Sequence, residues 1–369
     1  MGKVVQRPTR AAAEPGLRPR KGWARAEQTL HTFLAQVEPT ARHLLLCHSD
    51  ADGLASGVVL RRALERSGRS RVEVLATGKG ESAWSTDLLE RVASRRPDAL
   101  FVLDLGARSR PIFPGIPTLL IDHHRPLGVP PGALLITSYR WRPVPCTAAL
   151  VYRLGTTLAD ITDLEWVAAV GVIGELGDDA TLPPLPQARE RYGGTAIRET
   201  TVLVNAARRS DSGDPTPALQ ALLAAHEPAD ITEGRLPQAQ ALGRLRRAFN
   251  AALGQARRAA PVFGGRVALV RVRSPYQVHP VLARIWCARL PRFIVMVANE
   301  GYLAGRVNFS LRTALDVNLL DFLQAFRHGL DATEFGYGHD KATGGSLSRE
   351  DWQRLLASMG FPKSASGQR

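Results

Sequence analysis

Short apolar runs alternate with amphipathic stretches along the chain from about residue 41 onward. This alternation is typical of βαβ units, in which helices join the strands of a parallel sheet. Between the first two runs, residues 54–67 carry apolar side chains at helical spacing, which predicts a helix that covers the sheet. Helices are also predicted over residues 146–154 and 163–176. The predicted strands are the runs at residues 43–47, 72–75, 99–103 and 118–121.

A second α/β pattern follows a segment rich in turn residues, at 192–194 and 210–217. A helix predicted over residues 238–259 has a basic face and is expected to connect the two patterns. Beyond it, strands are predicted at 267–272, 293–298 and 303–311, and helices at 280–290, 319–326 and 350–359. The predicted fold class is α/β, with an N-terminal parallel-sheet domain joined by a helical linker to a smaller α/β domain.

The length of 369 residues also indicates two domains, because single cores stop growing at roughly 250–300 residues. The expected divisions are a basic, disordered tail at 1–25, a first domain at 26–205, a linker with the connector helix at 206–262 and a second domain at 263–369. The tail is rich in Arg, Pro and Ala and has no apolar run of the kind a secretory signal needs. A transit peptide is the alternative interpretation of the tail.

Composition indicates a globular protein without a membrane span. Hydrophobic residues make up 44% and charged residues 22%, and no stretch approaches ~18 uninterrupted apolar residues. Cys47, Cys146 and Cys287 are odd in number and far apart, which argues against a disulfide framework or a thiolate zinc site. A reducing, cytoplasmic location is therefore expected.

The formal net charge of +14 favours a polyanionic partner, because excess cations attract nucleic acid by steering and counterion release. A general preference for Arg across the chain is an alternative source of this charge. Charge by itself therefore supports nucleic-acid binding without establishing it.

Ligand-type side chains follow three of the predicted strands, each immediately after the last apolar residue. They are His48, Asp50 and Asp52 after the first strand, Asp104 after the third, and Asp122, His123 and His124 after the fourth. In an open parallel sheet such groups converge in a crevice at the carboxyl ends of the strands. Clustered carboxylates repel one another unless cations lie among them. Carboxylate and imidazole ligands without thiolate favour Mn²⁺ or Mg²⁺ over structural zinc.

Each of these motifs alone has a plainer explanation. An Asp-x-Asp sequence after a strand is more often a turn or a helix cap, and a His-His pair is no more specific. The recurrence at three successive strand ends favours a metal site. Gly53 adds to this because it permits a tight turn from the strand into a helix.

These segments resemble motifs one to three of the DHH phosphoesterase superfamily, which includes RecJ-type exonucleases and oligoribonucleases. The matching residues are His48-Ser-Asp50-Ala-Asp52-Gly53-Leu54-Ala55-Ser56, Asp104, and Asp122-His123-His124. Residues 336–345 are similar to the Gly-Gly-Gly-His segment of the DHH-associated domain, and 309–312 to its Ser-x-Arg strand. The resemblance implies a DHH catalytic domain at 26–205 and a substrate-binding, DHH-associated domain at 263–369.

The resemblance also implies roles for individual residues. One cation would be held by His48, Asp50 and Asp104, and a second by Asp52, Asp104 and His123, with Mn²⁺ as the expected ion and Mg²⁺ as the alternative. Asp122 would orient a neighbouring group, and His124 would contact the scissile phosphate. The implied substrate-binding residues of the second domain are Ser310, Arg312, Gly338, His339, Gly344 and Gly345.

The fourth motif departs from the family pattern, which has Asp where this chain has Glu175. The longer side chain could still reach a metal. Asp178, one helical turn later on the expected helix, is the other candidate ligand.

Three functions are compatible with these motifs. The first is a Mn²⁺-dependent phosphodiester hydrolase, a RecJ-like exonuclease or oligonucleotidase acting on single-stranded nucleic acid or short oligonucleotides. The second is a phosphodiesterase or pyrophosphatase acting on small nucleotides or cyclic dinucleotides. The third is a non-catalytic nucleic-acid-binding protein in which the fourth motif has failed.

Overall fold

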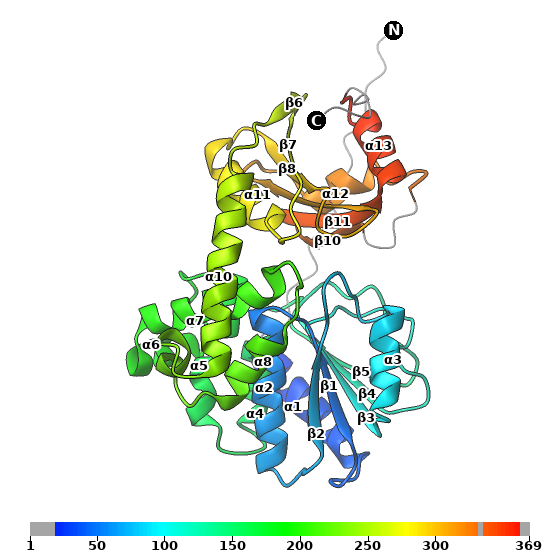
Figure 1. The fold of residues 1–369 in the computed structure, drawn as a ribbon. Coiled ribbons are helices and arrows are strands. Elements are labelled where there is room, and N and C mark those ends of the chain that lie inside the picture. The colour runs from blue at the N-terminus through cyan, green and yellow to red at the C-terminus, as the bar shows by residue number, and fades with distance from the viewer. Residues whose placement is uncertain (1–18, 331–334, 362–369) are drawn as a thin grey trace.

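The computed structural model describes residues 19–330 and 335–361, which form two α/β domains (Figure 1). Helix α10 (Pro237–Ala256) runs from one domain to the other along one side of the molecule. The predicted fold class is confirmed. None of the helices in the described segments combines the length and hydrophobicity that a bilayer crossing requires.

The first domain contains a five-stranded parallel sheet with the order β2-β1-β3-β4-β5. Because β1, β3 and β4 are neighbours, their carboxyl ends lie side by side at one edge of the sheet. Four of the strands were predicted, and the short edge strand β5 was not. The strands are β1 (His43–Cys47), β2 (Val72–Ala76), β3 (Ala99–Leu103), β4 (Thr118–Asp122) and β5 (Leu134–Thr137).

Helices cover both faces of this sheet, which explains why its strands are apolar on both sides. Side chains of β3 alternate between two apolar cores, with Phe101 in the larger core and Val102 in the smaller. Helix α3 (Thr86–Ser94) packs on the smaller core. The larger core is covered by α1 (Pro19–Ala35), α2 (Ala51–Arg66), α4 (Thr147–Gly155) and α5 (Glu165–Leu176), with the short helix η1 (Thr162–Leu164) before α5.

The predicted tail at residues 1–25 is wrong at its C-terminal end. Helix α1 begins at Pro19, and Ala26 is part of the larger core. Trp23 packs edge-on against Trp141, with 4.8 Å between the ring centroids. The start of α1 therefore packs on the first domain through apolar residues at helical spacing. The rest of the predicted tail, residues 1–18, lies outside the described residues.

The predicted linker at 206–262 is also corrected, because most of it belongs to the first domain. Ala221, Leu222 and Ile231 are buried in the larger core, as are Ala239 and Leu242 at the start of α10. The turn residues near 193 and 210–217 end helices without ending the domain. The helices of this region are α6 (Leu185–Tyr192), α7 (Gly194–Arg209), α8 (Thr216–Ala224) and α9 (Pro228–Thr232).

The C-terminal half of α10 packs on the second domain through Phe249 and Ala256. That domain contains a six-stranded sheet with the order β10-β11-β9-β8-β7-β6, in which only β7 and β8 pair in parallel. Its strands are β6 (Val262–Gly264), β7 (Val267–Val272), β8 (Ile294–Asn299), β9 (Arg306–Thr313), β10 (Phe335–His339) and β11 (Ala342–Ser348). Helix α11 (His279–Arg289) covers one face, and α12 (Leu319–Gln324) and α13 (Arg349–Ser358) cover the other.

Candidate metal centre and interdomain cleft

The turn after β1 brings His48, Asp50 and Asp52 to the carboxyl end of the sheet. Asp50 caps α2, where its Oδ1 accepts a hydrogen bond of 3.1 Å from Gly53 N. A Cβ at position 53 would lie 2.3 Å from the carbonyl oxygen of His48, so the turn requires glycine. The Asp-x-Asp segment is therefore both a helix cap and part of a cluster of ligand-type groups.

One set of potential ligand atoms comes from His48, Asp50 and Asp104. His48 Nδ1 lies 2.9 Å from Asp50 Oδ2 and 3.6 Å from Asp104 Oδ2. Burial lowers the pKa of His48, but the two carboxylates outweigh this and raise the pKa to about 9. The three side chains can hold a cation between them.

A second set comes from Asp52, Asp104 and His123, all of which are buried. His123 Nδ1 lies 3.3 Å from Asp104 Oδ1 and 3.6 Å from Asp52 Oδ2. Both oxygens of Asp52 also accept hydrogen bonds from the first backbone N–H groups of α4, at Thr147 and Ala148. Asp104 belongs to both sets, as a bridging ligand must.

Asp104 has a backbone φ of +61°, which is uncommon for a residue other than glycine. Its side chain is held by a hydrogen bond of 3.1 Å from Thr147 Oγ1. Sparsely populated backbone conformations persist where surrounding contacts fix them, and they concentrate at functional sites. The conformation turns the carboxylate of Asp104 toward both sets of ligands.

The electrostatics of the cluster fit a cation site. Burial and the neighbouring Asp104 raise the pKa of Asp52 well above its usual range. Burial lowers the pKa of His123, but its contacts with Asp104, Glu175 and Asp52 outweigh this and raise the pKa to about 12. Without other cations, protons must offset the crowded negative charge. Oxygen and imidazole ligands of this kind suit Mn²⁺ or Mg²⁺, which would replace those protons.

Asp122 positions His124 at the end of β4. Asp122 Oδ1 accepts hydrogen bonds from the backbone N–H of His124 at 2.6 Å and from its Nδ1 at 2.9 Å, and Asp122 Oδ2 accepts one from Gly106 N. Burial raises the pKa of Asp122, but the bonds from His124 outweigh this and hold the pKa at about 2. These bonds fix the position of the His124 ring relative to the end of β4.

The structure distinguishes the two candidates for the fourth motif. Glu175 Oε1 lies 3.3 Å from His123 Nε2 and 3.1 Å from His339 Nε2. Asp178 is instead paired with Arg189 and Arg198 on the surface, apart from the cluster. The physical reason is that α5 ends at Leu176 and Gly177 turns the chain with φ +89°, which takes Asp178 off the helix face.

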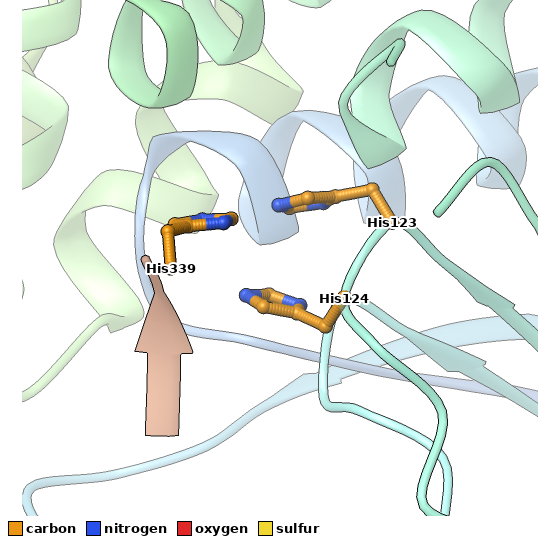
Figure 2. Close-up of side chains that lie close together, drawn as sticks. All are labelled: His123, His124 and His339. Atoms are coloured by element: carbon orange, nitrogen blue, oxygen red, sulfur yellow. The ribbon is translucent and has the colours of Figure 1, made fainter. Parts of the chain in front are cut away.

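Three imidazole rings meet where the two domains face each other (Figure 2). His123 and His124 follow β4, and His339 reaches toward them from the end of β10. The ring centroids of His123 and His124 are 4.1 Å apart, and His339 lies 5.9 Å and 5.7 Å from them. The second domain therefore contributes directly to the surroundings of the cluster.

The predicted substrate-binding residues of the second domain line a cleft of about 580 Å³ between the domains, together with His48, His124 and Glu175. They are Ser310, Arg312, Gly338, His339, Gly344 and Gly345. Arg312 has no ion-pair or hydrogen-bond partner within the described residues and is available to an anion. Packing of the sheet also requires glycine here, because a Cβ at Gly344 would lie 2.3 Å from the carbonyl oxygen of Phe309.

Two residues of this site were not found from the sequence. Arg208 Nη1 donates a hydrogen bond of 2.8 Å to Asp50 Oδ2 from the last turn of α7. Lys79 Nζ, in the loop after β2, donates to the carbonyl oxygens of Asp211 and Pro275 and lies 4.6 Å from the ring centroid of Tyr302. In a chain with many basic residues, no local pattern marks these two.

The fold and the site together define a two-domain α/β protein with a candidate dinuclear metal centre in an interdomain cleft. Residues 43–170 match the DHH family, N-terminal domain. A comparison with curated protein sequences finds no match. Residues 43–170 thus correspond to the DHH family, N-terminal domain, and the fold as a whole is RecJ-like.

Solved structures share this fold at low sequence identity. RecJ from Thermus thermophilus in complex with Mn²⁺ superposes with a TM-score of 0.65 at 20% identity, over 96% of this chain and 56% of that chain. An exonuclease RecJ bound to manganese gives 0.59 at 19% identity, over 96% and 98% of the two chains. The DHH domain of a member of the s1p family of ribosomal proteins gives 0.64 at 12% identity, over 93% and 95%. This chain thus spans little more than half the length of the Thermus protein.

Proposed function

We propose that this protein is a divalent-metal-dependent phosphodiester hydrolase that acts on single-stranded nucleic acid or short oligonucleotides, with Mn²⁺ as the working ion and Mg²⁺ as the alternative. The observation that carries the proposal is that two sets of ligand atoms share Asp104 and face Arg312 across one cleft. RecJ structures with the same fold contain Mn²⁺ or Mg²⁺. The formal charge of +14 is consistent with a polyanionic substrate.

The residues that would hold the ions are those with the right chemistry and spacing. His48, Asp50 and Asp104 would bind one ion, and Asp52, Asp104 and His123 the other. When bound, two such ions would supply the chemistry for an in-line displacement, by activating a water and stabilising the leaving oxygen. Glu175 contacts His123 and so helps to orient one of the ligands.

The protein's own side chains would bind and orient the phosphate. His124 is fixed through its Nδ1 by Asp122, and its ring lines the cleft. Arg312 lies on the opposite wall, and its guanidinium has no partner among the described residues, which suits bidentate binding of a phosphate. Ser310, on the same face of β9, can donate a further hydrogen bond to the phosphate.

The dimensions of the cleft favour a second candidate, a phosphodiesterase or pyrophosphatase for small nucleotides or cyclic dinucleotides. A volume of about 580 Å³ falls within the range of small-ligand sites. One part of the cleft is also bounded by Lys79, which bridges the domains through its hydrogen bond to the carbonyl oxygen of Pro275. Both features suit short substrates better than long strands.

A digestion series over substrate length tests these candidates. The full chain is incubated with Mn²⁺, with Mg²⁺ or with EDTA, and with dinucleotides, pentanucleotides and strands of several tens of nucleotides. Metal-dependent release of mononucleotides from single strands supports the proposal. Turnover of dinucleotides alone selects the second candidate, and tight binding without hydrolysis under saturating Mn²⁺ selects a non-catalytic nucleic-acid-binding protein.

A further inference from the structure

The second domain contains a buried carboxamide that its own structure does not satisfy. Asn308 on β9 is only 8% exposed, yet its Oδ1 has no hydrogen-bond partner within the described residues. A buried polar atom left without a partner costs about 1–3 kcal/mol. Such atoms are rare in folded proteins, and each one calls for a physical explanation.

The position of Asn308 supplies that explanation. Side chains alternate along β9, with Val307, Phe309 and Leu311 in the core beneath α12 and α13. Asn308, Ser310 and Arg312 lie on the opposite face, and all three line the interdomain cleft. The unsatisfied carboxamide therefore stands in the same row as the two groups that suit a phosphate.

Asn299, at the neighbouring position, has a purely structural set of hydrogen bonds and serves as a comparison. It lies on β8 directly opposite Asn308, and it is also buried. Its Oδ1 accepts hydrogen bonds from Ser274 N and Gly301 N, and its Nδ2 donates to the carbonyl oxygen of Tyr276. Both polar atoms of that carboxamide bond to adjoining loops, whereas the carboxamide oxygen of Asn308 has no partner in the segments that the structure describes.

We propose that Asn308 is a specificity-determining residue that contacts the nucleoside part of the substrate, next to the phosphate held by Ser310 and Arg312. The proposal rests on the proposed function. A phosphodiester offers only acceptors, so it cannot satisfy the carboxamide oxygen. Sugar hydroxyls and base edges offer both donors and acceptors, which is what a carboxamide binds.

The test compares wild type with Asn308→Leu, which keeps the size of the side chain and removes its polar atoms. Single-stranded trinucleotides are used in two arms. One arm pairs ribo- and deoxyribo-oligoadenylates, which differ in the 2′-hydroxyl. The other holds the sugar as deoxyribose and varies the base. Within each arm, the readout is the kcat/KM for the preferred substrate divided by the kcat/KM for the other substrate. Loss of a contact of this kind should reduce this preference in one arm by about tenfold.

Thermal unfolding separates a substrate contact from a structural role. Asn308→Leu should melt at or above the wild-type temperature, because the variant removes a buried oxygen that has no partner in the described part of the chain. Asn299→Leu is the matched control and should melt lower, because three hydrogen bonds are lost. A lower melting temperature for Asn308→Leu, or unchanged ratios in both arms, would overturn the proposal.

Failure of the proposed hydrolase function can be distinguished from failure of the proposal for Asn308. If wild type hydrolysed none of these strands, the same ratios would be measured as dissociation constants by fluorescence anisotropy in EDTA. A reduced ratio for Asn308→Leu in binding would still support the specificity role. Equal ratios for the two proteins would contradict it.

Discussion

Glu175 Oε1 lies 3.1 Å from His339 Nε2, so the carboxylate of the fourth motif joins the candidate metal centre to the second domain. The same oxygen lies 3.3 Å from His123 Nε2. An aspartate at this position would be one methylene shorter. The longer side chain of Glu175 contacts both histidines at once.

The first prediction concerns Glu175 and Asp178. Glu175→Gln should lower kcat by about 10- to 100-fold and raise the Mn²⁺ concentration needed for activity, since it weakens the orientation of His123. Asp178→Asn is the matched control, because Asp178 pairs with two surface arginines apart from the cluster, and the steady-state kinetics of this variant should equal those of wild type. Full activity in Glu175→Gln with loss in Asp178→Asn would reverse the assignment.

Asp104→Asn should abolish hydrolysis, because Asp104 is the residue common to both sets of ligands. The expected loss is at least about 10³-fold, the scale at which a lost catalytic electrostatic contact is measured. Asparagine tolerates the positive φ of this position, so the metal-free fold should survive. Circular dichroism melting in EDTA checks the fold, and substantial remaining hydrolysis would rule out the two-metal arrangement.

Lys79→Met should loosen the two domains. The substitution removes the bonds to the carbonyl oxygens of Asp211 and Pro275 and the contact with the Tyr302 ring. We expect small-angle X-ray scattering to give a larger radius of gyration. In steady-state kinetics, the fold increase in KM should exceed the fold decrease in kcat. Lys341→Met breaks contacts only within the second domain and should leave the scattering unchanged. Identical scattering for Lys79→Met and wild type would contradict this role.

His279 should make the fold sensitive to acid. Burial lowers its pKa to about 3, and the nearby Arg208 adds to the effect, whereas an unfolded histidine titrates near ~6.5. Between these values only the unfolded chain binds the proton, so stability falls as pH decreases through that window. Urea unfolding at pH 6.5 and 5 should show wild type losing about 1–2 kcal/mol more than His279→Phe. Parallel losses in the two proteins would show that His279 is not the cause.

Gly22→Ala should destabilise the first domain, because a Cβ there would lie 2.6 Å from the ring of Trp141. Overpacking of this kind costs about 1–3 kcal/mol. Gly254→Ala on α10 is the matched control, because no atom lies within 4 Å of the added Cβ. There the better helix propensity of alanine should add about 0.5–1 kcal/mol. Urea unfolding of both variants measures the difference, and equal stabilities would mean that α1 does not pack as described.

The amino-acid sequence alone predicted the strand ends that form the site. His48, Asp104 and His123 each follow an apolar run, and a parallel sheet brings such positions to one edge whatever the rest of the chain does. The chemistry of their side chains then limits the ligand to a cation. The pattern needed for this inference is local, which is why it could be seen without coordinates.

Other features depend on how distant segments pack, and these became visible in the folded protein. The tertiary structure separated Glu175 from Asp178 through a turn at Gly177, brought Arg208 to Asp50, and extended the first domain through α8 and α9. It also left the carboxamide oxygen of Asn308 without a partner among the described residues, beside the fully bonded Asn299. These outcomes depend on contacts between residues far apart in the chain, which periodicity along the sequence does not encode.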